Sequence, residues 1–139
     1  MNNLTVSVVL PYRDAVSTLD ECLHSVLTQS YTDFELLMIN DHSNDGSEQL
    51  VTRYLNQDKR LRLLASPGKG LVAALNFGLR KAKGRFVARM DADDRMRPDR
   101  LKQQVKTLET QSNLSLLACQ VHLFPEQTIQ AGYQEYIRW

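Results

Sequence analysis

The hydrophobic residues of this chain occur in short unbroken runs, separated by segments in which apolar residues recur every three or four positions. Such runs are typical of strands buried in a parallel sheet, and the periodic segments are typical of amphipathic helices. The predicted strands are 4–10, 34–39, 61–65, 85–90 and 114–124. The predicted helices begin near Ser17, Ser47, Leu71 and Pro98. This alternation predicts an α/β protein with three α/β/α layers, a mostly parallel, Rossmann-like sheet and right-handed crossovers.

Several residues predict where elements end and how they pack. Pro11 is expected to end the first strand, and Ser17 with Asp20 resembles a capping box for the first helix. Gly78 indicates that the third helix packs closely on the sheet. The stripe of this helix expected to face the sheet consists of Leu71, Leu75, Gly78, Leu79 and Ala82.

Acidic residues follow the carboxyl ends of three predicted strands. Asp14 follows the first strand, Asp41 follows the second, and the segment 91–94 follows the fourth. Ligands of doubly wound sheets bind in a crevice outside the carboxyl ends of the strands. Topology alone therefore predicts that these acids line one binding crevice.

Asp91, Ala92, Asp93 and Asp94 form the densest group of acids. Like charges this close repel, so they are tolerated best when they are solvated or share a cation. On an extended backbone Asp91 and Asp93 project to the same side, with Cα atoms roughly 6.6 Å apart. Carboxylates suit a hard divalent cation, Mn²⁺ or Mg²⁺. The alternative is a solvated lead-in to the next helix, which suits Asp94 best.

The loop after the second strand begins like a calcium-binding loop, but Thr52 stands where a bidentate glutamate is needed. Asp41 is better suited to accept hydrogen bonds from a ligand. The alternative is that this loop only caps the next helix, through Ser43 or Asp45. Further on, the segment around Lys69 has glycine on both sides but matches no phosphate-binding loop, so it also fits a flexible turn.

Composition limits the kinds of partner and the cellular compartment that can be expected. A chain of 139 residues with 42% hydrophobic content fits one domain, 1–139. The formal net charge of +1 gives no reason to expect nucleic acid as a partner. Cys22 and Cys119 match no zinc or redox spacing and lie in apolar runs, so both are expected to be buried and reduced, as in a cytoplasmic protein. The apolar run 6–10 is too short to span a membrane and lacks a basic leader, so no transmembrane segment is expected.

The last residues, 127–139, could form a helix with an uncovered apolar face. The apolar residues of that face are Tyr133, Tyr136, Ile137 and Trp139. Two expectations follow: the chain is truncated, and the exposed aromatic tail favours a homo-oligomer.

Together these segments resemble the N-terminal, nucleotide-sugar-binding part of a family 2 glycosyltransferase of the GT-A fold. The matching segments, in the family's order, are Val6-Ser-Val-Val-Leu-Pro11, Gln29-Ser-Tyr31 with Asp33-Phe-Glu35, Asn40-Asp41 to Asp45-Gly46-Ser47, Gly70-Leu71 to Asn76 with Gly78, and Ala88-Arg-Met-Asp-Ala-Asp-Asp94 with Pro98, Arg100 and Leu101. The resemblance implies that the acceptor-binding part is absent from this chain.

The resemblance also implies roles for single residues. Asp41 matches the acid that hydrogen-bonds the nucleotide base, and Pro11 starts the loop beside that base. Asp91 and Asp93 match the Asp-x-Asp pair that holds the ribose and the metal bridging the diphosphate, with Ala92 between them. The chain departs from the family at two places. Arg13 and Asp14 replace a tyrosine and an asparagine, with Tyr12 one place earlier, and Leu75 replaces an arginine, which leaves diphosphate contact to Arg89, Arg13 or Lys69.

The implied activity is metal-dependent transfer of a sugar, with inversion, from a nucleoside-diphosphate donor of the UDP type to the hydroxyl of a carbohydrate or lipid-linked acceptor. The family's general base lies in the second half, beyond Trp139, so no residue here is assigned to it, and donor binding with little or no transfer is expected. One alternative is a non-catalytic nucleotide-binding or interaction module. A second is a Mg²⁺-dependent phosphatase of the haloacid dehalogenase type, with Asp91 as nucleophile, but Arg95 stands where that class has threonine or valine.

Overall fold

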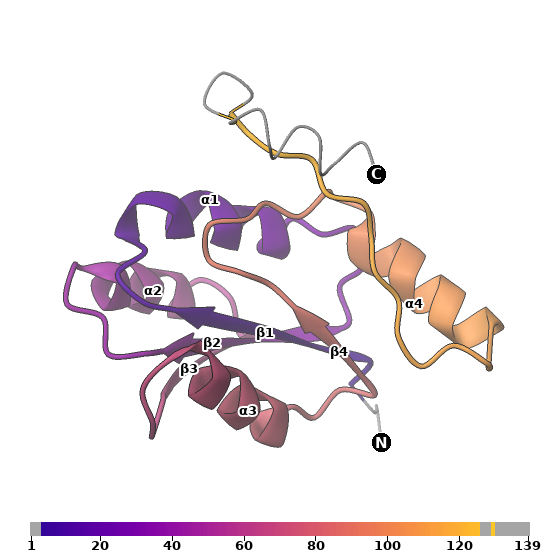
Figure 1. Ribbon diagram of the computed structural model, residues 1–139, viewed down its shortest axis with the longest axis horizontal. Helices are drawn as coiled ribbons and strands as arrows, with labels where there is room; N and C mark the ends of the chain where they lie inside the picture. Colours follow the sequence, from indigo (N-terminus) through magenta and orange to yellow (C-terminus); the bar gives the residue numbers. More distant parts are fainter. Residues whose placement is uncertain (1–3, 126–128, 130–139) are drawn as a thin grey trace. The chain divides into compact units, whose positions relative to one another are not determined.

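The computed structural model describes residues 4–125 and residue 129. The chain divides into two compact units, one up to Lys106 and one from Thr107 onward. The elements, labelled in Figure 1, are β1 (Val6–Tyr12), α1 (Val16–Leu27), β2 (Phe34–Asn40), α2 (Ser47–Leu55), β3 (Leu61–Ala65), α3 (Leu71–Lys81), β4 (Phe86–Arg89) and α4 (Arg100–Thr110). Each of the first four predicted strands is confirmed to within two residues at either end.

The first unit is built on a four-stranded sheet in the order β3-β2-β1-β4. All three neighbouring pairs are parallel, as predicted. Val8 of β1 lies between Leu36 of β2 and Ala88 of β4. Every residue of β1 and β2 is buried, which explains why these strands read as unbroken apolar runs.

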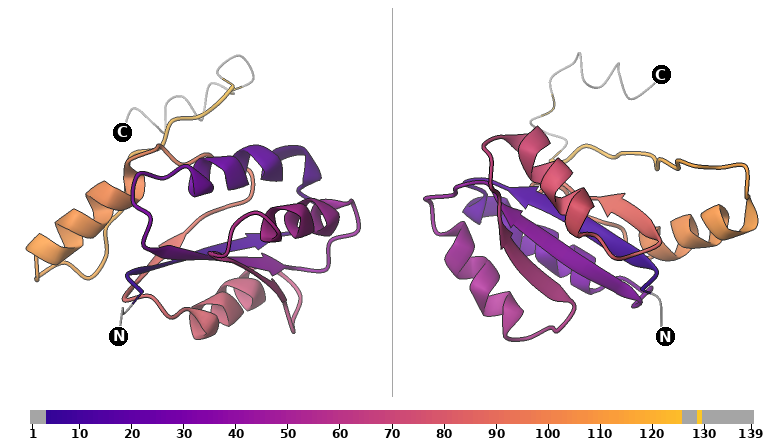
Figure 2. Two further views of the ribbon diagram at one scale, coloured as in Figure 1. Left: turned by 180° about the vertical axis from the view of Figure 1, so that it is seen from behind. Right: turned by 90° about the horizontal axis from the view of Figure 1, so that it is seen from below.

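Helices cover both faces of the sheet, which gives the predicted three layers (Figures 1 and 2). Alternate residues of β1 point to opposite faces. Val8 and Leu10 belong to the larger core cluster, together with buried residues of α1 and α2, whereas Val9 packs with Ala74 of α3. Gly78 brings α3 close to the sheet, because a Cβ added there would lie 2.4 Å from Cγ1 of Val9.

Strand β1 continues through Pro11, contrary to the prediction that Pro11 ends it. Val9 accepts a hydrogen bond from Met90 on the β4 side, and Tyr12 accepts one from Asp41 on the β2 side. Pro11 therefore faces the β4 side, like Val9, at a level where β4 has already ended at Arg89. Its missing N–H removes no hydrogen bond from the sheet, so proline is tolerated there.

Two details of the helices differ from the predictions. Helix α1 begins at Val16 after Ala15, not at a capping box of Ser17 and Asp20. In α3 the buried residues are Ala74 and Gly78, whereas Leu71 and Leu79 are about half exposed, at 50% and 51%. Close approach to the sheet leaves room only for small side chains along the line of contact, so the leucines lie outside it.

The second unit holds the end of α4 and the segment 111–125. The strand predicted at 114–124 is wrong, because no strand forms there. An apolar run becomes a strand only when its backbone pairs with another strand. Leu116 is 86% exposed and Cys119 is exposed, so the expected burial of Cys119 is also wrong, whereas Cys22 is buried as predicted. The predicted tail helix lies outside the described residues. Within residues 4–125 and 129, no helix is both long and apolar enough to cross a membrane.

Candidate functional site

A pocket of about 390 Å³ opens at the carboxyl ends of β1 and β4, beside the first turn of α1. This is the edge of the sheet at which topology predicted a binding crevice. The lining residues are Pro11, Tyr12, Arg13, Asp14, Ala15, Ser17, Thr18, Leu71, Asp91, Ala92 and Asp93. The structure thus brings together most of the residues predicted from sequence, while Asp41, Lys69 and Arg89 are not among the lining residues.

The acid cluster forms a turn directly after β4. The N–H of Asp94 donates to the carbonyl of Asp91 at 3.2 Å, which closes the turn. Asp91 and Asp93 line the pocket and Asp94 does not. Partial burial raises the pKa of Asp94, and the charges of Asp93 and Asp91 raise it further. The three carboxylates therefore repel one another, as their spacing predicted.

Arg89 partly offsets this repulsion. Its guanidinium donates from Nε and Nη2 to the two carboxylate oxygens of Asp91, both at 3.0 Å. Both side chains are substantially exposed, at 56% and 38%. Arg89 therefore lies against the acid cluster itself, and its charge is directed at Asp91.

The donor set suits a hard cation only in part. Among residues 4–125 and 129, no three His, Cys, Asp or Glu side chains gather closely enough to hold a metal ion. Asp91 and Asp93 supply carboxylate oxygens to one pocket, and hard divalent cations prefer oxygen ligands. An ion held by these two residues would need its remaining ligands from water or from a bound anion.

Asp41 lies at the end of β2 and is only 5% exposed. Both of its carboxylate oxygens accept the N–H of Gly70 at 3.0 Å, which joins the end of β2 to the start of α3. An ionised carboxylate has about four acceptor sites, so capacity remains for a ligand N–H or hydroxyl. A ligand role for Asp41 stays a prediction.

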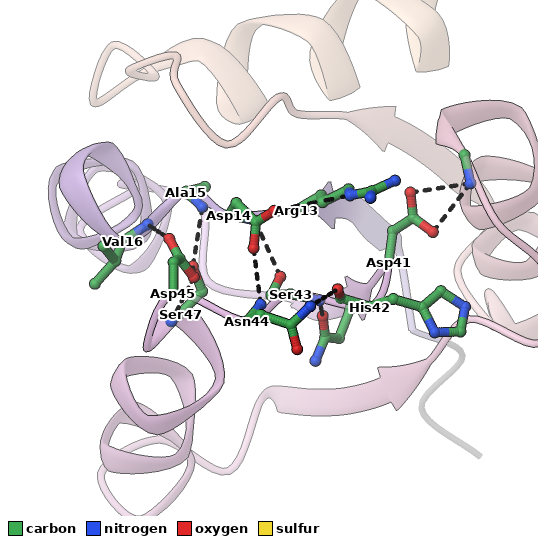
Figure 3. Close-up of polar contacts among 12 residues, drawn as sticks. Arg13, Asp14, Ala15, Val16, Asp41, His42, Ser43, Asn44, Asp45 and Ser47 are labelled. Carbon is green, nitrogen blue, oxygen red and sulfur yellow. Dashed lines mark hydrogen bonds and ion pairs between the residues drawn. The ribbon is translucent and has the colours of Figure 1, made fainter.

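The loop after β1 is held by the loop after β2 (Figure 3). Asp14 has a left-handed backbone with φ of 47°, which is uncommon for a residue other than glycine. Its N–H donates to Oγ of Ser43 at 3.2 Å, and its Oδ1 accepts the N–H of Asn44 at 2.7 Å. These bonds keep Arg13 and Asp14 at the rim of the pocket.

Asp45 and Ser47 cap α1 from this second loop (Figure 3). Ala15 donates its N–H to Oγ of Ser47 at 2.9 Å, and Val16 donates to Oδ2 of Asp45 at 2.8 Å. The hydroxyl of Ser47 also donates to Asp45, and these hydrogen bonds hold the pKa of Asp45 below its ordinary value. Asp45 also accepts the N–H of Ser47, the first residue of α2, at 3.0 Å, as expected if Asp45 caps the next helix. Sequence reasoning, which considered Asp45 and Ser43 only for that helix, missed that Asp45 caps the preceding one as well.

Tyr12 contributes to the pocket wall but is only 2% exposed. Its ring packs in the larger core cluster, and among the described residues its hydroxyl has no hydrogen-bond partner. Burial raises the pKa of this hydroxyl, and the charges of Glu48 and Asp45 add to the effect. Little of the ring is therefore available to stack on a ligand.

Sequence reasoning missed Ser17, Thr18 and Leu71 as pocket residues. All three lie in the first turn of a helix that follows a strand, Ser17 and Thr18 in α1 and Leu71 in α3. The topological rule that located the crevice also places the first turns of these helices at the same edge. Applied to the helices as well as to the strands, that rule would have predicted these residues from the sequence.

Known proteins are similar to this chain in sequence and in fold. The family model described as glycosyl transferase family 2 matches residues 7–135. An uncharacterised glycosyltransferase of Haemophilus influenzae is 36% identical over 106 residues, which is 76% of this chain and 42% of that protein. The putative teichuronic acid biosynthesis glycosyltransferase TuaG of Bacillus subtilis is 32% identical over 108 residues, which is 77% of this chain and 43% of that protein. The chain thus spans less than half the length of these relatives.

Solved structures show the same architecture. S. aureus TarS in complex with UDP superposes with a TM-score of 0.71 and 26% identity, over 76% of this chain and 32% of that one. The mannosyltransferase PcManGT of Pyrobaculum calidifontis, in complex with GDP-Man and Mn²⁺, has a TM-score of 0.69 and 29% identity, over 74% of this chain and 32% of that one. The fold is therefore the GT-A type expected from the sequence.

Proposed function

This chain belongs to glycosyltransferase family 2, and from that premise we propose that its pocket binds a nucleoside-diphosphate sugar for transfer to an acceptor hydroxyl. The observation that carries the proposal is the presence of Asp91 and Asp93 in the wall of one pocket, at the carboxyl end of β4. Bound UDP in TarS, and GDP-Man with Mn²⁺ in PcManGT, support a nucleotide-sugar donor and a divalent ion here. We favour a donor of the UDP type.

In the proposed complex Asp91 and Asp93 would hold Mn²⁺ or Mg²⁺, and the ion would supply positive charge to the departing diphosphate. Arg13, exposed at the pocket rim, adds positive charge near the phosphates. Asp41 accepts hydrogen bonds from the nucleotide base while it retains its contact with Gly70. Ser17 and Thr18, which line the same pocket, carry hydroxyl groups.

The acceptor in this proposal is a carbohydrate or a lipid-linked sugar, and transfer inverts the anomeric carbon. The name of TuaG, which places that relative in teichuronic acid biosynthesis, supports a carbohydrate acceptor. Among the described residues we assign no general base. The phosphatase alternative is set aside, because family membership points elsewhere and the acid cluster follows the fourth strand, at the sheet edge.

A thermal-shift experiment tests donor binding. UDP at a hundred times its Kd should add about 2.7 kcal/mol of stability, which raises the melting temperature by several degrees. The shift should require Mn²⁺ or Mg²⁺, disappear with a chelator and be lost in Asp93→Asn. A folded wild-type protein that responds to neither UDP nor GDP would overturn the proposal.

Sugar transfer is measured separately, as acceptor-dependent release of UDP from a UDP-sugar. Release that increases with added carbohydrate acceptor supports the transferase. Metal-dependent UDP binding without such release by a protein extended beyond Trp139 supports the alternative of a nucleotide-binding module, whereas the same result with residues 1–139 alone is expected in either case.

A further inference from the structure

The loop that carries the acid cluster is fixed by α1. This loop connects β4 to α4 and contains the turn closed by Asp94 and Asp91. Three of its backbone groups bond to residues of α1 or to the turn after it. The thiol of Cys22 donates to the carbonyl of Asp91 at 3.4 Å, and the N–H of Met96 donates to Oγ of Ser25 at 2.9 Å. The N–H of Ser30 donates to the carbonyl of Pro98 at 2.8 Å.

Gln29 holds the same loop with both ends of its amide. Its nitrogen donates to the carbonyl of Arg97 at 2.6 Å and to the carbonyl of Ser25 at 3.1 Å. Its oxygen accepts the N–H of Leu101 at 3.1 Å. Gln29 is only 4% exposed, so water cannot readily replace these bonds if the loop moves away.

The hydrogen bonds of Gln29 are of the kind that hold a loop in a fixed position. A side chain without the amide would leave the N–H of Leu101 without its partner in a buried place, whereas the carbonyl of Arg97 would keep only its bond from the N–H of Arg100. Those two groups lie on either side of the start of α4, which follows directly after the acid loop. The positions of carboxylates that share a cation must be fixed to within a fraction of an ångström. Residues that hydrogen-bond to the segment carrying the ligands, without touching the cation, provide this restraint.

We propose that Gln29 is a positioning residue that fixes the loop bearing Asp91 and Asp93, so that both carboxylates are placed to hold the metal that accompanies the donor. The inference rests on the proposed function and deepens it. Gln29 does not line the pocket, and its amide is already bonded to the backbone of Ser25, Arg97 and Leu101, so it acts through the loop. Its removal should therefore weaken the metal-dependent part of nucleotide binding and leave the metal-independent part intact.

The test uses Gln29→Met, which keeps the length of the side chain and removes its hydrogen bonds. Ser25→Ala is the second variant, since it removes the acceptor for Met96 with a smaller change in the core. Val51→Ala is the matched control, because it shortens a fully buried side chain of α2 and makes none of these bonds to the acid loop. Each protein is compared with wild type by hydrogen exchange of peptides covering 91–99 and by UDP titration with Mn²⁺ and with EDTA.

In Gln29→Met we expect faster exchange across 91–99 and about a tenfold loss of UDP affinity in Mn²⁺, equal to about 1.4 kcal/mol. The much weaker UDP affinity that remains in EDTA, titrated at UDP concentrations above those of the thermal-shift experiment, should change less than about twofold, which is under 0.5 kcal/mol at about 1.4 kcal/mol per tenfold. Val51→Ala should lower the melting temperature without either effect. Should Gln29→Met fail to fold, Ser25→Ala must show the same pattern.

Three results overturn the inference, and they are distinguishable. If wild type binds UDP with Mn²⁺ and the folded variants bind it equally well, Gln29 is not a positioning residue while the proposed function stands. If wild type binds no nucleotide with metal, the proposed function fails and the inference fails with it. Equal loss of affinity in Mn²⁺ and in EDTA would also contradict the inference, because it indicates general destabilisation.

Discussion

The carboxylate of Asp41 accepts the backbone N–H of Gly70 with both oxygens, at 3.0 Å each. Asp41 directly follows β2 and Gly70 precedes the first residue of α3, so this contact joins two elements on one edge of the sheet. Gly70 has φ of 93° and ψ of 159°, a backbone conformation that is open essentially only to glycine. The contact therefore depends on a residue without a Cβ atom.

Gly70→Ala should lower the free energy of unfolding by about 1–3 kcal/mol through backbone strain. A Cβ at this position would meet no atom within 4 Å, so steric crowding adds nothing to the cost. Urea unfolding measures the change. Lys69→Ala, at the neighbouring exposed position, should stay within about 0.5 kcal/mol of wild type. Equal stability of Gly70→Ala and wild type would show that this backbone conformation is not required.

Asp45→Asn should lower stability at neutral pH, because the ionised carboxylate accepts hydrogen bonds from Val16 and Ser47. The pKa of Asp45 is lowered in the folded protein, so its stabilising effect is present above the ordinary carboxyl pKa. The effect is lost as pH falls through the lowered value. Melting curves of wild type and variant should therefore differ at pH 7 and converge in acid. A difference independent of pH would contradict this origin.

Part of the candidate site could be predicted from the sequence, because the order and direction of the strands determine where those residues lie. Asp91 and Asp93 follow a strand whose alternating apolar residues are evident in the sequence, and parallel strands deliver their carboxyl ends to one edge. Nothing more than strand order was needed to bring them near Asp14. Gly78 was also predictable, because a glycine within a helix commonly marks close packing.

Other features depend on contacts between distant segments and carry no local pattern. Asp45 bonds to the start of α1, which lies about thirty residues earlier, as well as to the start of α2, and its neighbours in sequence suggest only α2. Pro11 was read as a strand end because its position relative to the shorter β4 is a property of the sheet. The segment 114–124 has the composition of a strand, yet composition cannot show whether a partner strand is present.

Glu35→Gln should destabilise the fold without affecting nucleotide binding. Glu35 is 6% exposed; its carboxylate accepts the hydroxyl of Ser7 at 2.7 Å, the guanidinium of Arg62 at 2.7 Å and the N–H of Lys83 at 2.9 Å. Removing one acceptor from a buried network costs about 1–3 kcal/mol. This network lies near the amino ends of β1 and β2, away from the pocket.

The pKa of Glu35 supplies a second measurement. Burial alone would raise it, but the hydrogen bonds from Ser7, Arg62 and Lys83 outweigh burial and leave the pKa below its ordinary value. The stabilising effect is therefore present above the ordinary glutamate pKa and lost as pH falls through the lowered one. The difference between Glu35→Gln and wild type should shrink in acid, while UDP affinity at pH 7 stays equal. A weakened affinity would show that the network reaches the site.

Asp94→Asn should stabilise the protein at neutral pH, in contrast to Asp93→Asn, which should abolish metal-dependent UDP binding. The raised pKa of Asp94 means that its ionised form is disfavoured in the folded state, first by burial and then by Asp93 and Asp91. Stability contributed by the protonated form is lost as pH rises from the ordinary carboxyl pKa through the raised value. The stability gained from Asp94→Asn should therefore be full above that pH window and shrink below it.

Mn²⁺ bound by Asp91 and Asp93 would offset the same repulsion, so adding metal should also reduce the stability gained from Asp94→Asn. Urea unfolding of both variants, at several pH values with Mn²⁺ and with EDTA, measures these differences. If Asp94→Asn abolished metal-dependent UDP binding as completely as Asp93→Asn, Asp94 would belong with the metal-binding residues, although it does not line the pocket.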